Sequence, residues 1–290
     1  MQDTTSYSRI IAGTMTWGSW GKQLSTQQMI ALINHCMEVG ITSFDHADIY
    51  GDYENETVFG KAFAESGIER SSVQFISKCG IQMTNGRQNK VAHYQYDSAY
   101  IIWSVEQSLK KLRTDYLDLL LLHRPSPLME PNEIAGAIQK LMAQGKIKRF
   151  GVSNFTPLQI AMLETRQPIT ANQVEFSLTH DEPMYDGTFD DSIAANRMAM
   201  SWSPLGNYFR DKNLQNERIR KVLNVLKTKY DADESQLLLA FILKHPAGVH
   251  PVVGTANKER LKLSIEAVAI KLELQDWFLL LEASKGEPVP

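Results

Sequence analysis

The sequence contains few cysteines and no long apolar segment, and both absences exclude classes of protein. Cys36 and Cys79 are the only cysteines among 290 residues, which is typical of reduced thiols rather than of a disulfide-stabilised secreted fold. No apolar run reaches the roughly 18 residues that a membrane-spanning helix needs. The first ten residues lack a basic segment followed by an apolar one, so we expect no signal peptide and predict a cytoplasmic protein.

An excess of one charge is also missing. The 30 Lys and Arg residues nearly balance the 33 Asp and Glu residues, which gives a formal net charge of −3. Without a basic stripe, nucleic acid is not expected as a partner, and no segment suggests a membrane surface. The histidines form no HxxxH or HxH pair, so no metal site is expected. No interface segment stands out, which favours a monomer.

Short β-branched runs alternate with amphipathic segments along the chain. The predicted strands are 9–14, 41–45, 73–78, 117–123, 150–153, 172–176, 199–203 and 249–253. The predicted helices are 26–39, 54–64, 98–112, 131–144, 157–166, 191–196, 217–230, 234–244, 258–268 and 275–283. Eight strand–helix units without a linker fit an α/β fold, a (β/α)₈ TIM barrel that residues 1–290 form as a single domain. The rival, an open doubly wound sheet, expects GxGxxG after an early strand, and residues 13–21 lack that spacing.

Ionisable side chains follow three consecutive predicted strands, at the end where a barrel places its active site. These residues are Asp45, Tyr50, Lys78 and His123. A lysine beside a phenol stabilises the phenolate and lowers the tyrosine pKa, and a carboxylate keeps that lysine charged. A histidine at the same point can donate a hydrogen bond to a substrate oxygen. Together these groups form a general acid for an oxygen that gains negative charge, as reduction of a carbonyl by hydride requires.

In their order along the chain, the motifs resemble those of the aldo-keto reductases, which are (β/α)₈ enzymes that use NADPH. The matching residues are Gly40, 45–51 (DHADIYG), Glu56, Gly60, 76–78 (ISK), 119–123 (LLLLH), 151–155 (GVSNF) and 172–175 (NQVE). Each motif alone is a weak signal, but the ordered set is specific, and the resemblance extends from about residue 9 to residue 267. A bacterial oxidoreductase subgroup that carries FDHADIYG and SKCG is the most similar.

The resemblance implies a role for each matching residue. Tyr50 would donate a proton to the carbonyl oxygen, Lys78 and Asp45 would tune it, and His123 would orient the substrate. The cofactor-binding residues would be Ser153, Asn154, Gln173, Trp202, Ser203, Leu205, Gly254, Thr255, Lys258 and Arg260. Among them, Ser153, Asn154 and Gln173 would hold the nicotinamide carboxamide. Trp202 would stack on the nicotinamide ring, and Ser203 and Leu205 would line the pyrophosphate channel. The cations of Lys258 and Arg260 would bind the 2′-phosphate, which favours NADPH over NADH.

The sequence departs from the family pattern at two places. Residues 206–210 (GNYFR) replace a glycine-rich stretch that often follows Ser-Pro-Leu, and the chain ends soon after its last predicted helix. Without a long C-terminal loop, we expect an open substrate pocket lined by Trp17, His46 and Trp20. Asp48 either competes for Lys78 or has a structural hydrogen-bonding role, and we favour the latter. Cys79 should point away from Lys78 and be packed, because side chains alternate along a strand.

Two other functions stay open beside reduction of aldehydes or ketones by NADPH. Lys78 could be the Schiff-base lysine of an aldolase, although Ser153, Asn154 and Gln173 would then have no explanation. The chain could also be a regulatory subunit that binds NADPH without turnover, as some relatives of the family are. The substrate is expected to be a small carbonyl compound, whose identity depends on the pocket loops rather than on the fold.

Overall fold

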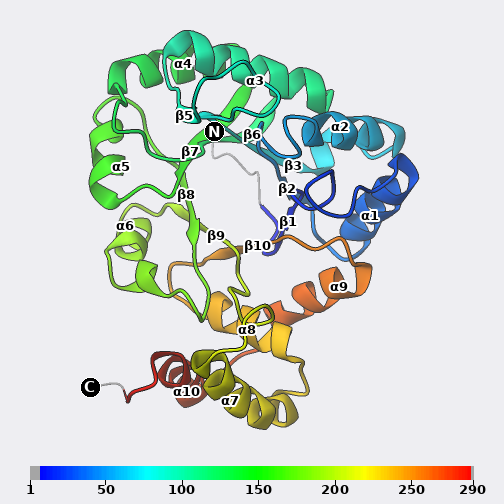
Figure 1. The fold of residues 1–290 in the computed structure, drawn as a ribbon, viewed down its shortest axis with the longest axis vertical. Coiled ribbons are helices and arrows are strands. Elements are labelled where there is room, and N and C mark those ends of the chain that lie inside the picture. Colours follow the sequence, from blue (N-terminus) through cyan, green and yellow to red (C-terminus); the bar gives the residue numbers. More distant parts are fainter. Residues whose placement is uncertain (1–6, 289–290) are drawn as a thin grey trace.

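The computed structural model describes residues 7–288, and its centre is a closed barrel of parallel strands (Figure 1). The barrel strands are β1 (Ile11–Gly13), β2 (Ser43–Asp45), β3 (Gln74–Cys79), β6 (Leu117–Leu122), β7 (Ile147–Ser153), β8 (Ala171–Glu175), β9 (Met198–Trp202) and β10 (His250–Val253). They follow one another around the barrel in chain order, and β10 returns to pair with β1 through Ile11 and Val252. The TIM-barrel prediction is confirmed; the ends of the predicted domain range, 1–6 and 289–290, lie outside the described residues.

Helices surround this barrel and alternate with its strands (Figure 1). They are α1 (Thr26–Glu38), α2 (Asn55–Glu65), α3 (Ser98–Leu112), α4 (Pro131–Ala143), α5 (Pro157–Glu164), α6 (Thr188–Ala194), α7 (Leu214–Tyr230), α8 (Glu234–Leu243), α9 (Lys258–Glu266) and α10 (Leu274–Lys285). Helix α10 packs on α7 and lies at one end of the molecule, beside α8 (Figure 1). Within residues 7–288, no helix is both long and apolar enough to cross a bilayer.

Local sequence signals explain where the helices begin and end. Ser25 Oγ caps α1 by accepting a hydrogen bond from the Gln28 amide, and Gln28 Oε1 accepts one from the Ser25 amide. The buried stripe of α1 consists of Met29, Leu32, Ile33 and Cys36. Gly40 follows the helix with φ of +85°, a conformation in which glycine has no steric penalty. The predicted start and stop of this helix are therefore set by its own caps.

The apolar run of β6 divides between two sides of the barrel wall. Leu119 and Leu121 join a small cluster inside the barrel, with Ile11, Ile76 and Met200. The alternate residues Leu120 and Leu122 point the other way and pack in the layer between barrel and helices. Both faces of the strand are buried, which explains why its sequence is continuously apolar.

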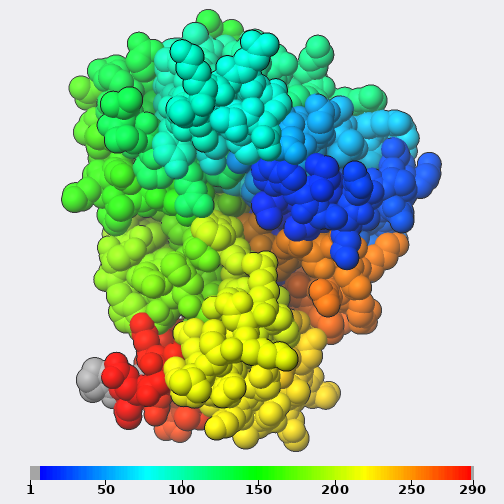
Figure 2. Space-filling model, viewed as in Figure 1, coloured from blue at the N-terminus to red at the C-terminus, as the bar shows by residue number. Residues whose placement is uncertain are grey.

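A β-hairpin near the predicted site was not predicted from the sequence. An antiparallel hairpin of β4 (Ile81–Gln82) and β5 (His93–Tyr94) follows β3. Two-residue strands leave too little alternation for a sequence pattern to indicate them. In Figure 2 the cyan segment that contains this hairpin, the dark-blue segment after β1 and the yellow segment after β9 all lie toward the viewer. All three follow the C-terminal ends of barrel strands, so this face is the one that carries the predicted site.

Candidate active site

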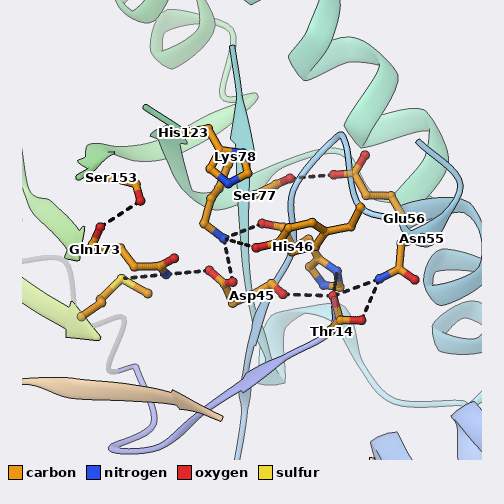
Figure 3. Close-up of polar contacts among 12 residues, drawn as sticks. Thr14, Asp45, His46, Asn55, Glu56, Ser77, Lys78, His123, Ser153 and Gln173 are labelled. Carbon is orange, nitrogen blue, oxygen red and sulfur yellow. Dashed lines mark hydrogen bonds and ion pairs between the residues drawn. The ribbon is translucent and has the colours of Figure 1, made fainter. Parts of the chain in front are cut away.

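Three neighbouring strands each carry an ionisable side chain at the same end of the barrel. Asp45 is the last residue of β2, Lys78 lies one residue before the end of β3, and His123 directly follows β6. The Nζ atom of Lys78 lies 2.6 Å from Asp45 Oδ2 and donates a 2.9 Å hydrogen bond to the main-chain oxygen of His46 (Figure 3). Tyr50, in the turn after β2, holds its hydroxyl oxygen 3.4 Å from the same nitrogen. The structure thus brings together the four ionisable residues singled out in the sequence.

Lys78 is enclosed, and Asp45 balances its charge. The two side chains are 1% and 3% exposed. Burial alone would lower the pKa of the Lys78 ammonium, but the charge of Asp45 and the phenol of Tyr50 outweigh burial and raise it. Lys78 is therefore a fixed positive charge beside the Tyr50 hydroxyl at physiological pH. A Schiff-base lysine needs a neutral amine, so this environment disfavours the aldolase alternative.

The pKa of Tyr50 is raised, whereas the nearby Lys78 alone predicts a lowered value. Burial has the largest effect and raises the pKa; Lys78 opposes it, and the charge of Asp45 adds to it. The expected direction was wrong because the phenol is enclosed as well as close to a cation. Tyr50 therefore carries its proton at neutral pH, which is the state that a general acid needs before it reacts.

His123 lies edge-on to Tyr50, with the ring centroids 6.0 Å apart. Burial, and then the charges of Lys78 and Arg124, lower the pKa of His123 well below its ordinary value. The ring is therefore neutral and has one N–H to donate. Its Nδ1 atom is buried with no hydrogen-bond partner among residues 7–288. A proton on Nε2 would let the ring donate to an oxygen held beside Tyr50.

Gln173 joins these ionisable groups to the predicted nicotinamide site. Its Nε2 atom donates a 2.9 Å hydrogen bond to Asp45 Oδ1, so both carboxylate oxygens of Asp45 accept hydrogen bonds (Figure 3). Its main-chain oxygen accepts a 2.8 Å hydrogen bond from Ser153 Oγ. Because the side-chain nitrogen of Gln173 is hydrogen-bonded to Asp45, the side-chain oxygen of Gln173 is the atom that would contact a nicotinamide carboxamide.

Asn154 extends the same network to Trp202. Asn154 Nδ2 donates to Ser153 Oγ at 2.8 Å, and Trp202 Nε1 donates to Asn154 Oδ1 at 2.9 Å. The backbone of Asn154 has φ of +63°, in the left-handed region that non-glycine residues seldom adopt. Such strain is concentrated at functional sites, where the surrounding contacts maintain it. The structure thus places Ser153, Asn154, Gln173 and Trp202 in one connected group.

The loop after β9 is anchored without a glycine-rich sequence. Ser203 begins it with φ of +52°, and Leu205 packs against the apolar layer between barrel and helices. Gly206 is required there, since a Cβ atom would lie 2.0 Å from Thr179 Oγ1. Tyr208 then fixes the loop by burying its ring to 1% exposure. The loop is therefore held in place by one glycine and one buried aromatic ring.

The segment after β10 approaches the loop that follows β1. The main-chain oxygen of Gly254 accepts a 2.8 Å hydrogen bond from Thr16 Oγ1, and that of Thr255 accepts a 3.1 Å bond from Trp17 Nε1. Gly254 is exposed, and a Cβ there would meet nothing within 4 Å. This segment leads directly into α9.

The first turn of α9 carries the two cations predicted to bind a 2′-phosphate. Asn257 caps the helix by accepting a 3.0 Å hydrogen bond from the Arg260 amide. Lys258 and Arg260 are exposed, and their side chains form no ion pair or hydrogen bond with any described residue. Two unpaired cations at a helix N-terminus repel each other and the helix dipole unless an anion lies between them. This arrangement fits the phosphate of a dinucleotide.

Trp17 and His46 do not line the substrate pocket, and that expectation was wrong. Both residues are 0% exposed. Trp17 packs edge-on against Phe44, and the His46 ring contacts Phe59 with a centroid distance of 4.3 Å. The motif places His46 directly after Asp45, so its side chain points to the opposite side of the strand, away from the site.

Trp20 is the third residue expected at the pocket, and its position differs from that of the other two. Trp20 is 39% exposed, and its ring centroid lies 6.2 Å from that of Tyr50. Trp20 therefore borders the site, in the loop between β1 and α1.

The Asp48 amide donates a 3.0 Å hydrogen bond to the Lys78 carbonyl, but its carboxylate does not pair with the Lys78 ammonium and instead accepts hydrogen bonds from Tyr100 Oη at 3.3 Å and Ser104 Oγ at 3.1 Å. Burial, with the added charge of Glu56, raises the pKa of Asp48 to about 7.

Cys79 is 1% exposed and packs in the apolar layer, as predicted for a side chain on the other face of β3. Both cysteines are unpaired and buried. Among residues 7–288, no three His, Cys, Asp or Glu side chains are grouped to hold a metal ion.

Two features of the site were missed in the sequence. Arg124 follows His123 directly, and its charge acts on both His123 and Tyr50. Its position in the LLHRP run, directly after the end of a barrel strand, is the sequence signal that could have identified it. Tyr96, after the unpredicted hairpin, clamps that backbone: its hydroxyl donates to the Arg124 carbonyl at 2.5 Å and accepts from the Arg124 amide at 3.2 Å.

Comparison with known proteins finds relatives over the full length of the chain. Oxidoreductase YdhF of Escherichia coli (strain K12) is 39% identical over 289 residues, which cover 98% of this chain and 96% of the relative. The 6-dehydroglucose reductase of Agrobacterium fabrum (strain C58) is 33% identical over 293 residues, covering 100% and 98%.

A solved structure is similar over nearly the same length. The aldo-keto reductase from Klebsiella pneumoniae, in complex with NADPH, superposes with a TM-score of 0.79 and 26% identity, covering 98% of this chain and 92% of the other. The aldo/keto reductase family model matches residues 9–284. On the evidence of this match and of the full-length relatives, the chain belongs to the aldo/keto reductase family.

Proposed function

We propose that the protein is an NADPH-dependent oxidoreductase that reduces aldehydes or ketones to alcohols, with Tyr50 as the general acid. The observation that carries the proposal is the contact between the Tyr50 hydroxyl and the protonated, Asp45-bound Lys78. A cation at 3.4 Å stabilises the phenolate that forms when the phenol gives up its proton. The family of the chain and its oxidoreductase relatives support the same activity.

Each residue of the site has a defined task in this reaction. When bound, NADPH supplies the hydride that the carbonyl carbon receives. Tyr50 donates its proton to the carbonyl oxygen, and Lys78 stabilises the resulting charge without moving, since Asp45 and the His46 carbonyl hold it. The neutral His123 donates a hydrogen bond to the same oxygen and fixes its position.

The described residues also fit the proposed cofactor. Donors and acceptors of Ser153, Asn154 and Gln173 are gathered at one end of the barrel, beside the indole of Trp202. Ser203 and Leu205 begin the loop beside them, and Gly254 and Thr255 lead to the unpaired cations of α9. An NADPH molecule extended from Trp202 to Arg260 would use both groups, with Lys258 and Arg260 on the 2′-phosphate.

Several finer predictions accompany the proposed activity. The subgroup defined by FDHADIYG and SKCG, a cytoplasmic location, a monomeric state and the absence of a nucleic-acid partner stay predictions. The regulatory alternative shares the NADPH site and differs only in turnover. Measurements of binding and of turnover on the same preparation separate the two.

The Tyr50→Phe variant tests the proposal. We expect NADPH oxidation with an aldehyde panel to fall by roughly 10²- to 10⁴-fold, because the proton donor is lost. NADPH affinity, measured by fluorescence titration, should be nearly unchanged, since the predicted cofactor contacts remain.

The matched control is Tyr116→Phe, which removes a phenol hydroxyl just before β6, at the opposite end of the barrel. That variant should keep wild-type turnover. Near-normal turnover by Tyr50→Phe would exclude Tyr50 as the acid. Tight NADPH binding by the wild type without turnover of any carbonyl compound would favour the regulatory alternative.

A further inference from the structure

Arg124 is a partly buried cation whose guanidinium has no carboxylate and no hydrogen-bond partner among residues 7–288. The described residues give it no ion pair and no side-chain hydrogen bond. Arg70 and Arg197, which are also shielded from solvent, bind Asp118 and the pair of Glu164 and Asp191, respectively. A guanidinium carries five N–H donors in a fixed fork, and leaving them unused in a shielded position is unfavourable.

The surroundings of Arg124 place this cation at the reacting end of the site. Its guanidinium carbon lies 5.4 Å from the centre of the Trp202 ring, whose indole nitrogen is bonded to Asn154. Its charge acts on Tyr50 and on His123, the two residues that would contact the carbonyl oxygen. The guanidinium therefore lies within electrostatic reach of both the proton donor and the predicted nicotinamide site.

The backbone that carries Arg124 is rigid. The Tyr96 hydroxyl bonds to both the amide and the carbonyl of Arg124, and Tyr96 is 6% exposed. The preceding residue is fixed by a 2.9 Å hydrogen bond from the His123 amide to the Cys79 carbonyl. Ligand binding therefore needs no further ordering of this backbone, which favours specific recognition.

The other charges of the site do not compensate Arg124. Lys78 is balanced by Asp45, and His123 is neutral. The shielded carboxylate of Asp48, in the segment after β2, accepts hydrogen bonds from Tyr100 and Ser104. A bound substrate therefore meets one unmatched positive charge next to its carbonyl group.

We propose that Arg124 selects carbonyl substrates that carry an anionic group, a carboxylate or a phosphate, close to the reacting carbon. The fork of the guanidinium matches both groups in a bidentate contact. The inference rests on the proposed reductase function and adds its substrate class. The anion replaces the missing partner of Arg124, while the carbonyl oxygen is held between Tyr50 and His123.

The test compares matched pairs of aldehydes in the NADPH oxidation assay. Succinic semialdehyde is paired with butanal, and glyceraldehyde 3-phosphate with glyceraldehyde, so that the two pairs separate carboxylate from phosphate. In the wild type, the charged member of at least one pair should have the higher kcat/KM. In Arg124→Gln, that kcat/KM should fall on the order of 10- to 100-fold more than the kcat/KM of the neutral member, mainly through KM. Arg124→Lys should retain part of the preference.

Two controls make each outcome decisive. Arg113→Gln removes one positive charge from the C-terminal end of α3, at the opposite end of the barrel, and should leave the preference intact. NADPH affinity should be unchanged in Arg124→Gln. Equal losses on charged and neutral substrates, a loss of NADPH affinity, or a wild type without preference would each overturn the inference. Failure of the wild type to oxidise NADPH with any of the four aldehydes would instead refute the proposed function.

Discussion

At the scale of single residues, Asp48 is the buried carboxyl whose ionisation opposes folding. Its pKa of about 7 lies above the ordinary value of 3.8, chiefly because of burial. The folded state therefore holds a proton that the unfolded state releases. The stabilisation is complete below about pH 4 and is lost as the pH rises through about 7.

The Asp48→Asn variant should remove this pH dependence. The side-chain oxygen of asparagine can still accept the bonds from Tyr100 and Ser104, and the amide cannot ionise. We expect the free energy of unfolding of the wild type to fall between pH 4 and pH 8 more steeply than that of the variant. Urea unfolding at several pH values measures this, with the exposed Asp115→Asn as control. Parallel wild-type and Asp48→Asn curves would show that Asp48 is charged in the folded state.

The sequence predicted the positions of site residues at strand ends better than the positions of the residues around them. Asp45, Lys78 and His123 could be found because a barrel directs the C-terminal ends of its strands to one place. The positions of Trp17 and His46 could not, because their side chains point outward into packing that depends on Phe44 and Phe59. The pKa direction of Tyr50 depends on how deeply its ring is enclosed, which no spacing encodes.

At the scale of secondary-structure elements, Gly60 sets how closely α2 can approach the end of α3. A Cβ atom at this position would lie 2.1 Å from the Lys111 carbonyl and 2.6 Å from the Leu112 Cα. Backbone atoms cannot move aside, so Gly60→Ala should separate the helices and destabilise the fold by about 1–3 kcal/mol. Thermal or urea unfolding measures the loss.

Gly136 provides the matched control in α4. A Cβ there would meet nothing within 4 Å, so Gly136→Ala should stabilise the protein by about 0.5–1 kcal/mol through lower backbone entropy in the unfolded state. Similar effects of the two substitutions would mean that the contact between α2 and α3 relaxes without cost.

Helices with strong local signals were predicted almost to the residue, whereas elements fixed by tertiary contacts were not. Helix α3 was predicted as 98–112, the bounds that the structure gives, because Asp97 caps its start and Arg113 ends it with φ of +54°. Strand β7 begins at Ile147, three residues before the predicted start, in a basic segment that pairing with β6 orders. The β4–β5 hairpin depends on contacts across its turn rather than on a periodic sequence.

At the scale of the whole molecule, the predicted cofactor would connect parts of the chain that are far apart in sequence. Asn154 follows β7, Trp202 ends β9, and Arg260 lies in α9, so one bound dinucleotide would span more than a hundred residues. A ligand that binds only the folded barrel stabilises all of it, by about 2.7 kcal/mol at a free concentration 100 times its Kd. NADPH should therefore raise the Tm of the wild type, and at equal concentration it should do so more than NADH.

The Arg260→Ala variant determines whether this difference arises at α9. The two cofactors differ only in the 2′-phosphate, so loss of its cation should reduce the Tm shift with NADPH toward that with NADH and leave the NADH shift unchanged. Lys262→Ala is the control, because Lys262 lies on the same helix and already pairs with Glu266 at 3.5 Å. If Arg260→Ala weakened both shifts equally, Arg260 would act on a part that the cofactors share, such as the pyrophosphate. If neither shift changed, the unpaired cations of α9 would lie outside the binding site, and the preference for NADPH would have to come from elsewhere in the barrel.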